Sequence, residues 1–197
     1  MARGDHKEAL IRTGLQLLPK TGYAGTGLNE IMQAAGVPKG SFYHYFGSKE
    51  AFAQEVARRY YAAHREFLQT FLAESAGSAG ARLAAYLKGV HDDVVAPGQD
   101  RFPGCLLGGL ALQVTDETLA LRTTVNELFA KWRAQLAVLV AQAQAAGEID
   151  PGRDPDALAG FILAGLEGAL MQTRLTGDGE PLREWTRQLL DSVLLSD

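Results

Sequence analysis

The chain has 197 residues, of which 47% are hydrophobic and 21% are charged, with 22 glycines and 7 prolines. This composition is typical of a folded globular protein and excludes a disordered chain, a collagen and a disulfide scaffold. No apolar run approaches the about 20 residues that a membrane helix needs, and the N-terminus lacks the apolar core of a secretory signal. The single cysteine cannot form an internal disulfide. We therefore expect a cytoplasmic protein with no membrane partner.

The formal net charge of −4 is unevenly distributed along the chain. Residues 1–65 contain nine Lys and Arg against five Asp and Glu, a net charge of +4. Residues 66–197 contain ten against eighteen, a net charge of −8. A basic segment joined to an acidic one favours a polyanionic partner for the basic segment, although a charge of this size would equally suit a solvated surface.

Apolar residues recur at helical intervals along almost the whole chain, with neither a persistent strand alternation nor a repeat of fixed period. We predict an all-α protein of about nine helices, several of which end at glycines. The expected helices cover about 5–20, 28–35, 38–46, a long stretch capped by Ser48, 79–95, 105–114, 117–146 with a cap at Thr115 and Asp116, 155–176 and 181–195.

Two short amphipathic helices separated by Gly36-Val37-Pro38 have the plan of a helix-turn-helix, whose second helix enters the major groove of DNA. At about 100° per residue, Phe42 and Phe46 fall on the inner side of this second helix, with Pro38 and Tyr45. We interpret the two phenylalanines as core residues. The outward residues are then Gly40, Tyr43 and His44, flanked by Lys39 and Ser41.

These outward residues are of types that bind DNA. Lys39 suits a phosphate or a guanine, Ser41 and His44 suit base edges or phosphates, and tyrosine hydroxyls suit phosphate oxygens. A glycine on this face lets the backbone approach DNA closely. Lys49 adds its charge beside the N-terminal N–H groups of the fourth helix. The alternative interpretation, an aromatic-rich helix packed in a core, suits Phe42 and Phe46 but not Tyr43 and His44, because so aromatic a run would be unusual on a solvent face without a partner.

The run GVPKGSFYHYFGSKEAF, residues 36–52, resembles the TetR family of bacterial transcription regulators. The resemblance implies a three-helix DNA-binding domain over residues 1–48 and an effector-binding and dimerisation domain over 49–197. In that family two long C-terminal helices pair across a two-fold axis, and here they would be those near 117–146 and 155–176. Carried over by position, the DNA contacts are Thr26, Lys39, Gly40, Ser41, Tyr43, His44, Tyr45 and Lys49.

Two further segments, residues 102–108 and 167–170, resemble the branch of this family that contains NemR and AcuR, regulators that respond to electrophiles or acrylate. In that branch a cysteine occupies the position of Cys105 and a lysine often occupies that of Arg174. An arginine beside the thiol would favour the thiolate. Cys105 is therefore a candidate sensor, and burial among leucines is its alternative role. Candidate pocket residues, which core packing or a dimer interface would also explain, are Phe129, Trp132, Glu167, Met171 and Arg174.

The resemblance implies a homodimeric repressor that binds a double-stranded, pseudo-palindromic operator and is released by a small-molecule or electrophile effector. Such a regulator is not an enzyme and needs no cofactor. The four histidines show no spacing suited to a metal site, so no metal is expected. Two alternatives stay open. One is an all-α enzyme that uses Cys105 as a nucleophile, and the other is a regulator of the same family that acts as an activator with a noncovalent ligand.

Overall fold

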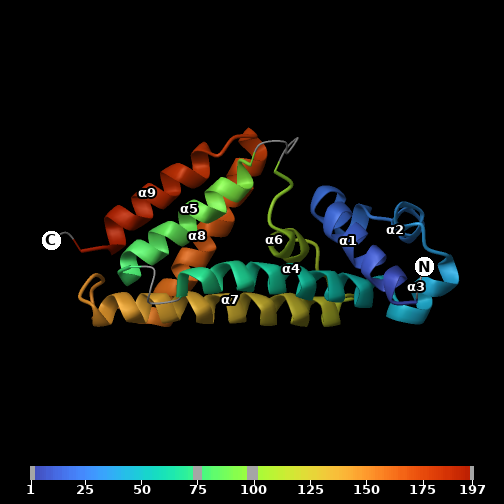
Figure 1. The fold of residues 1–197 in the computed structure, drawn as a ribbon, viewed down its shortest axis with the longest axis horizontal. Coiled ribbons are helices and arrows are strands. Elements are labelled where there is room, and N and C mark those ends of the chain that lie inside the picture. The colour runs from blue at the N-terminus through green and yellow to red at the C-terminus, as the bar shows by residue number, and fades with distance from the viewer. Residues whose placement is uncertain (1–2, 73–76, 97–101, 196–197) are drawn as a thin grey trace. The chain divides into compact units, whose positions relative to one another are not determined.

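The computed structural model describes residues 3–72, 77–96 and 102–195. It confirms the all-α class, since nine helices lie within these ranges (Figure 1). No helix in the described part of the chain has the length and apolar character to cross a membrane. The helices are α1 (Arg3–Gly25), α2 (Leu28–Ala35), α3 (Lys39–Phe46), α4 (Lys49–Leu72), α5 (Ala79–Val94), α6 (Leu106–Ala111), α7 (Leu119–Ala145), α8 (Pro155–Thr176) and α9 (Glu180–Val193).

Helix bounds agree with the prediction where a local signal ends the helix. Both α2 and α8 have the predicted bounds, because Gly36 and Gly177 close them in the left-handed conformation. The Asp154 carboxylate caps α8 by accepting the Ala157 N–H at 2.7 Å. The Ser48 hydroxyl caps α4 in the same way, accepting the Ala51 N–H at 3.0 Å.

The start of α7 differs from the prediction. The helix begins at Leu119, and the cap expected at Thr115 and Asp116 is wrong, because residues 115–118 form a turn of their own. Its hydrogen bonds include one from the Thr115 N–H to the Thr118 hydroxyl at 2.8 Å. The carboxylate of Glu50 in α4 instead accepts the N–H of Leu121 in the first turn of α7, at 2.9 Å.

The chain forms two compact units. The first comprises Met1–Ala63 and Cys105–Phe129, and the second comprises His64–Gly104 and Ala130–Asp197. Helices α4 and α7 each contribute one part to each unit. The boundary predicted at residue 48 falls inside the first unit, and it stays a prediction of where DNA binding ends and effector sensing begins.

In the first unit, α1, α2 and α3 pack against one another and form what we call the head (Figure 1). Beneath α3, the rings of Phe42, Phe46 and Phe52 have centroids 5.1 to 5.4 Å apart. A β-carbon at Gly14 of α1 would lie 2.6 Å from the Phe52 ring, so the glycine allows α1 to approach α4 closely. This aromatic cluster fixes the inner side of α3.

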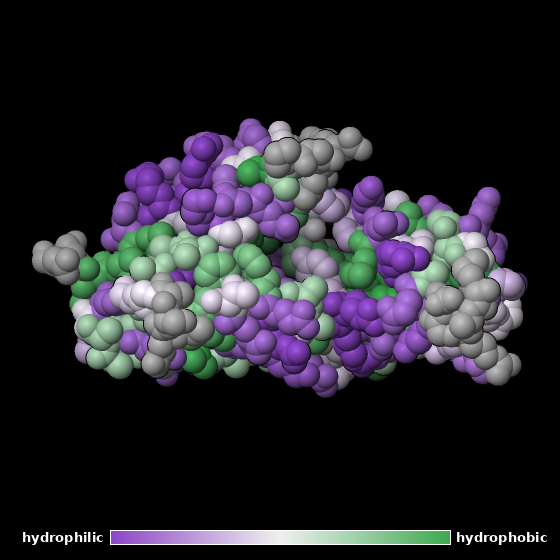
Figure 2. All heavy atoms as spheres, in the orientation of Figure 1, coloured by the Kyte–Doolittle hydropathy of each residue, from purple (hydrophilic) through white to green (hydrophobic). Residues whose placement is uncertain are grey.

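In the second unit, α9 packs on α5 and α8 (Figure 1). The core contains a polar chain, in which the Trp132 Nε1–H donates to the Tyr86 hydroxyl at 3.0 Å and His64 Nε2 lies 3.1 Å from the same oxygen. The His64 and Trp132 ring centroids are 4.0 Å apart. Figure 2 shows hydrophilic side chains over α9, where Arg187 pairs with Glu184 and Asp191.

Candidate nucleic-acid interface

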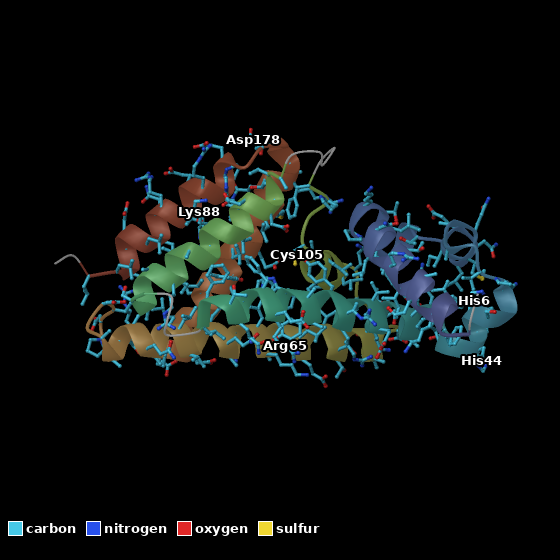
Figure 3. The ribbon with its side chains drawn as sticks, viewed as in Figure 1. His6, His44, Arg65, Lys88, Cys105 and Asp178 are labelled. Atoms are coloured by element: carbon cyan, nitrogen blue, oxygen red, sulfur yellow. The ribbon has the colours of Figure 1, made fainter. Side chains whose placement is uncertain are left out.

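The structure places the predicted outward residues of α3 on its exposed side. Lys39, Gly40, Tyr43 and His44 are exposed, whereas Ser41 and Tyr45 are half-buried. Figure 3 shows His44 at the outer edge of α3. Phe42 and Phe46 are buried, as expected, so α3 turns an apolar side inward and a polar side to solvent.

The structure differs from the prediction at Pro38 in two details. Pro38 is the N-cap of α3, with φ −62° and ψ 147°, and it therefore precedes the first helical residue. It is also exposed, so it does not join the inner side with Phe42. Gly36 adopts φ 64° and turns the chain between α2 and α3, which gives the tight connection that a helix-turn-helix requires.

Gly40 stands in open space on the exposed side of α3. A β-carbon at this position would meet nothing within 4 Å, and the backbone φ is not in the left-handed region. Glycine lowers helix stability by roughly 0.5–1 kcal/mol relative to alanine. The fold itself therefore gives no reason for a glycine here, and the open space is on the side expected to meet DNA.

The structure contradicts the predicted DNA contact of the Thr26 side chain. Its side chain is completely buried. The hydroxyl donates to the Gly22 carbonyl at 2.6 Å and lies 2.5 Å from the Thr21 hydroxyl oxygen. The predicted DNA contact is wrong for this side chain, because it is already bonded within the connection from α1 to α2. A polar residue beside a helix start suits both roles, and the sequence alone did not separate them.

Lys49 lies at the start of α4 with its ammonium held against α1. Nζ lies 4.7 Å from the Tyr23 ring centroid and donates to the Ala24 carbonyl at 3.5 Å. Burial lowers the pKa of Lys49. Burial also raises the pKa of Tyr23, and the nearby Glu50 carboxylate raises it further. No sequence pattern pointed to Tyr23, whose ring supports the lysine beside the predicted interface.

Cys105 is buried at the N-cap of α6, where Figure 3 shows it. The Tyr60 hydroxyl of α4 donates to Sγ at 3.8 Å, a contact that sequence reasoning missed. Phe129, on α7 in the same unit, is half-buried.

The other candidate effector residues belong to the second unit. Trp132 is buried and bonded to Tyr86, so it is a core residue there. Glu167 is half-buried, whereas Met171 and Arg174 are exposed on α8. The Arg174 side chain lies over the backbone of Gly104, 3.1 Å from where a β-carbon would be. Among the described residues, no group of three or more His, Cys, Asp or Glu could hold a metal ion.

A short amphipathic helix, a left-handed glycine turn and a second helix with a polar exposed side define a helix-turn-helix DNA-binding protein. Sequence comparison agrees. Residues 10–56 match the family described as bacterial regulatory proteins, tetR family. Residues 79–189 match the family described as tetracyclin repressor-like, C-terminal domain. The chain belongs to the TetR family and is a transcriptional regulator.

Individual relatives support the branch expected from the segments near Cys105. The chain is 34% identical over 180 residues to the transcriptional regulator AcuR of Cereibacter sphaeroides, covering 91% of this chain and 81% of AcuR. It is 29% identical over 196 residues to the HTH-type transcriptional repressor DhaR of Mycobacterium sp., covering 100% and 96%. The crystal structure of Escherichia coli NemR in its reduced form superimposes with a TM-score of 0.88 at 30% identity, covering 98% of each chain.

Proposed function

We propose that this regulator is a homodimeric repressor whose two α3 helices bind successive major grooves of a pseudo-palindromic operator. The observation that carries the proposal is the polar exposed side of α3, formed by Lys39, Gly40, Tyr43 and His44 above a buried aromatic cluster. Ser41, Tyr45 and Lys49 flank this side and complete the proposed DNA contacts. Two-fold symmetry of the protein would set the half-site centres about 34–36 Å apart.

The exposed apolar surface of α8 supports dimerisation through that helix. Phe161, Met171 and Leu175 are 63%, 54% and 71% exposed. Together with Ala164 and Gly168 they follow alternating spacings of three and four residues, and we call this set the α8 stripe. A β-carbon at Gly168 would meet nothing within 4 Å, which suits the close approach of a helix from a second copy.

The second unit's part of α7 has a similar but smaller exposed stripe. Its members follow the same spacing and are mostly small: Lys131, Ala134, Val138, Ala141 and Ala145. The guanidinium of Arg133 pairs with the Asp156 carboxylate at 3.1 Å and so links α7 to the start of α8. These features support the expected pairing through both long helices, with α8 supplying most of the apolar area.

For the effector we propose an electrophile that modifies Cys105. In this step a carbon–sulfur bond forms between the thiolate and the electrophile, and the thiol proton passes to the adduct. The Tyr60 hydroxyl donates to Sγ in the free protein, and the modified sulfur no longer fits this buried site at the start of α6. A dimer with the wrong head spacing then binds the operator less tightly. A noncovalent ligand in the second unit is the alternative.

The matched relatives are named as transcriptional regulators, which supports a regulator over an enzyme that uses Cys105 as its nucleophile. A regulator that binds chromosomal DNA works in the bacterial cytoplasm. The position of the operator relative to the promoter decides between repressor and activator, and the names of DhaR and NemR favour a repressor.

The direct test is a titration of the protein against the DNA upstream of its own gene at several salt concentrations. We expect sequence-selective binding whose logarithmic affinity falls with the logarithm of salt concentration. Tyr43→Ala and Lys39→Ala should each weaken operator binding while leaving thermal unfolding unchanged. Binding without sequence preference, or variants with wild-type affinity, would refute the proposed interface.

A further inference from the structure

The connection that ends α1, residues Gly22–Gly25, is held by side chains from three other parts of the first unit. The Thr26 hydroxyl donates to the Gly22 carbonyl at 2.6 Å. Lys49 donates to the Ala24 carbonyl at 3.5 Å from the start of α4. The side chain of Gln113, just beyond the end of α6, accepts the Ala24 N–H at 3.1 Å. This connection therefore joins α6 to the helix that follows the DNA-facing α3.

Gln113 is held in place from both ends of its amide. Its Nε2 donates to the Gly109 carbonyl of α6 at 2.9 Å, while its Oε1 accepts from Ala24. The amide packs so closely on Gly22 that a β-carbon there would lie 2.6 Å from Oε1. Gly22 also has φ 75°, which a side chain would disfavour. A residue other than glycine at position 22 would displace Gln113.

Helix α6 connects Cys105 to Gln113. α6 has only six residues, with Cys105 at its N-cap and Gln113 two residues after its end. A shift of this short helix at Cys105 therefore moves Gln113 as well. Through Ala24 the shift reaches Lys49, the first residue of α4, which follows the end of α3 by three residues. We infer that Gln113 is a positioning residue that couples the start of α6 to the orientation of the head.

This inference rests on the proposed function, because coupling matters only if the head binds an operator. Coupling between two sites is reciprocal, so operator binding must alter events at Cys105 if Cys105 alters operator binding. Cys105 is the single thiol of the chain and is buried, so a thiol reagent reaches it only when the surrounding structure opens. Its reaction rate therefore reports on α6 without any knowledge of the effector.

The experiment measures the rate at which N-ethylmaleimide alkylates Cys105, with and without the operator duplex found by the upstream titration. In the wild type we expect the duplex to slow alkylation by about fivefold or more. In Gln113→Leu, which removes both hydrogen bonds at nearly constant volume, we expect faster alkylation of the free protein and little further slowing by the duplex. Gln113→Asn, too short to reach Ala24, tests the same contact if the leucine variant folds poorly.

Gln144 offers a matched control. Its amide also bridges two backbone groups, donating to the Asp150 and Arg153 carbonyls at 2.9 and 2.7 Å, but it lies in the second unit. Gln144→Leu should keep the wild-type response of Cys105 to the duplex. A wild-type response in Gln113→Leu and Gln113→Asn, or a wild type that binds the operator with no change at Cys105, would overturn the inference and leave the proposed function standing.

A second measurement does not depend on DNA. Hydrogen exchange of the Ala24 amide should accelerate in Gln113→Leu, because its acceptor is gone, while amides of α5 and α9 keep their wild-type rates. Unchanged exchange at Ala24 would show that Gln113 does not hold the connection. Failure of the proposed function itself would appear separately, as the absence of operator binding by the wild-type protein.

Discussion

The Nε1–H of Trp132 donates to the hydroxyl of Tyr86 at 3.0 Å inside the second unit. The same hydroxyl oxygen lies 3.1 Å from His64 Nε2, so the indole, the phenol and the imidazole form one buried polar chain. Such a buried site disfavours a charged imidazole. Burial lowers the pKa of His64 from 6.5 to about 4, so the folded protein keeps the ring neutral near pH 7.

The buried histidine predicts a loss of stability in mild acid. In the unfolded chain His64 takes up a proton below pH 6.5, whereas in the folded protein it stays neutral down to about pH 4. The free energy of unfolding should therefore fall as the pH drops through this window, by about 2 kcal/mol between pH 7.5 and 5. Urea unfolding at both pH values measures the loss, and His64→Gln should show a loss smaller by that amount. An equal loss in both proteins would contradict the prediction.

Replacing Gly40 by alanine should separate stability from DNA binding. The added methyl meets open space in the free protein, so we expect thermal stability to rise by roughly 0.5–1 kcal/mol. Operator affinity should fall at least tenfold, because the methyl lies where the backbone would approach the groove. Calorimetry and fluorescence anisotropy measure the two effects. Undiminished affinity would remove Gly40 from the interface.

A charge placed on the α8 stripe should dissociate the dimer. Phe161→Glu puts a carboxylate into the proposed apolar contact, and analytical ultracentrifugation should then show a monomer with weakened operator binding. Gln69→Glu introduces the same charge at an exposed position of α4, away from the stripes of α7 and α8, and it should remain dimeric. A dimeric Phe161→Glu protein would mean that another surface forms the interface.

Cys105→Ser tests the proposed sensor. Serine is small and polar like the thiol, so operator binding should be retained within about threefold, consistent with a change at one buried side chain. Release of the operator by a quinone should be lost, because serine is not a nucleophile without an activating base. Release that persists in the variant would instead identify a noncovalent site for the effector.

Much of the fold and of the DNA-facing side could be predicted because the signals are local. The periodicity of α2 and the closing glycine at residue 36 lie within a few residues of the features that they determine. Phe42 and Phe46 likewise identify the inner side of α3 by spacing alone. Such signals indicate which side of a helix is buried and where it ends.

The remaining features depend on contacts between residues far apart in the sequence. Thr26 was expected at the DNA because nothing nearby in the sequence shows that its hydroxyl bonds to Gly22. The contact of Gln113 with Ala24 spans 89 positions, and that of Tyr60 with Cys105 spans 45. No pattern of apolar residues encodes a single polar pair at such a separation. Those pairs became visible only once the helices were packed.

The bond from the Leu121 N–H to Glu50 bears on how hybrid regulators should be built from this chain. A graft joined at residue 48 would keep Glu50 with Leu121, but it would take Phe52 from one parent and its ring contacts, Phe42 and Phe46 of α3, from another. The aromatic cluster beneath α3 would then combine side chains from two proteins that did not evolve to pack together. A junction beyond Val56, transferred together with residues 105–129, keeps each head with the helices on which it packs, and gives a practical route to exchanging operator preference between relatives.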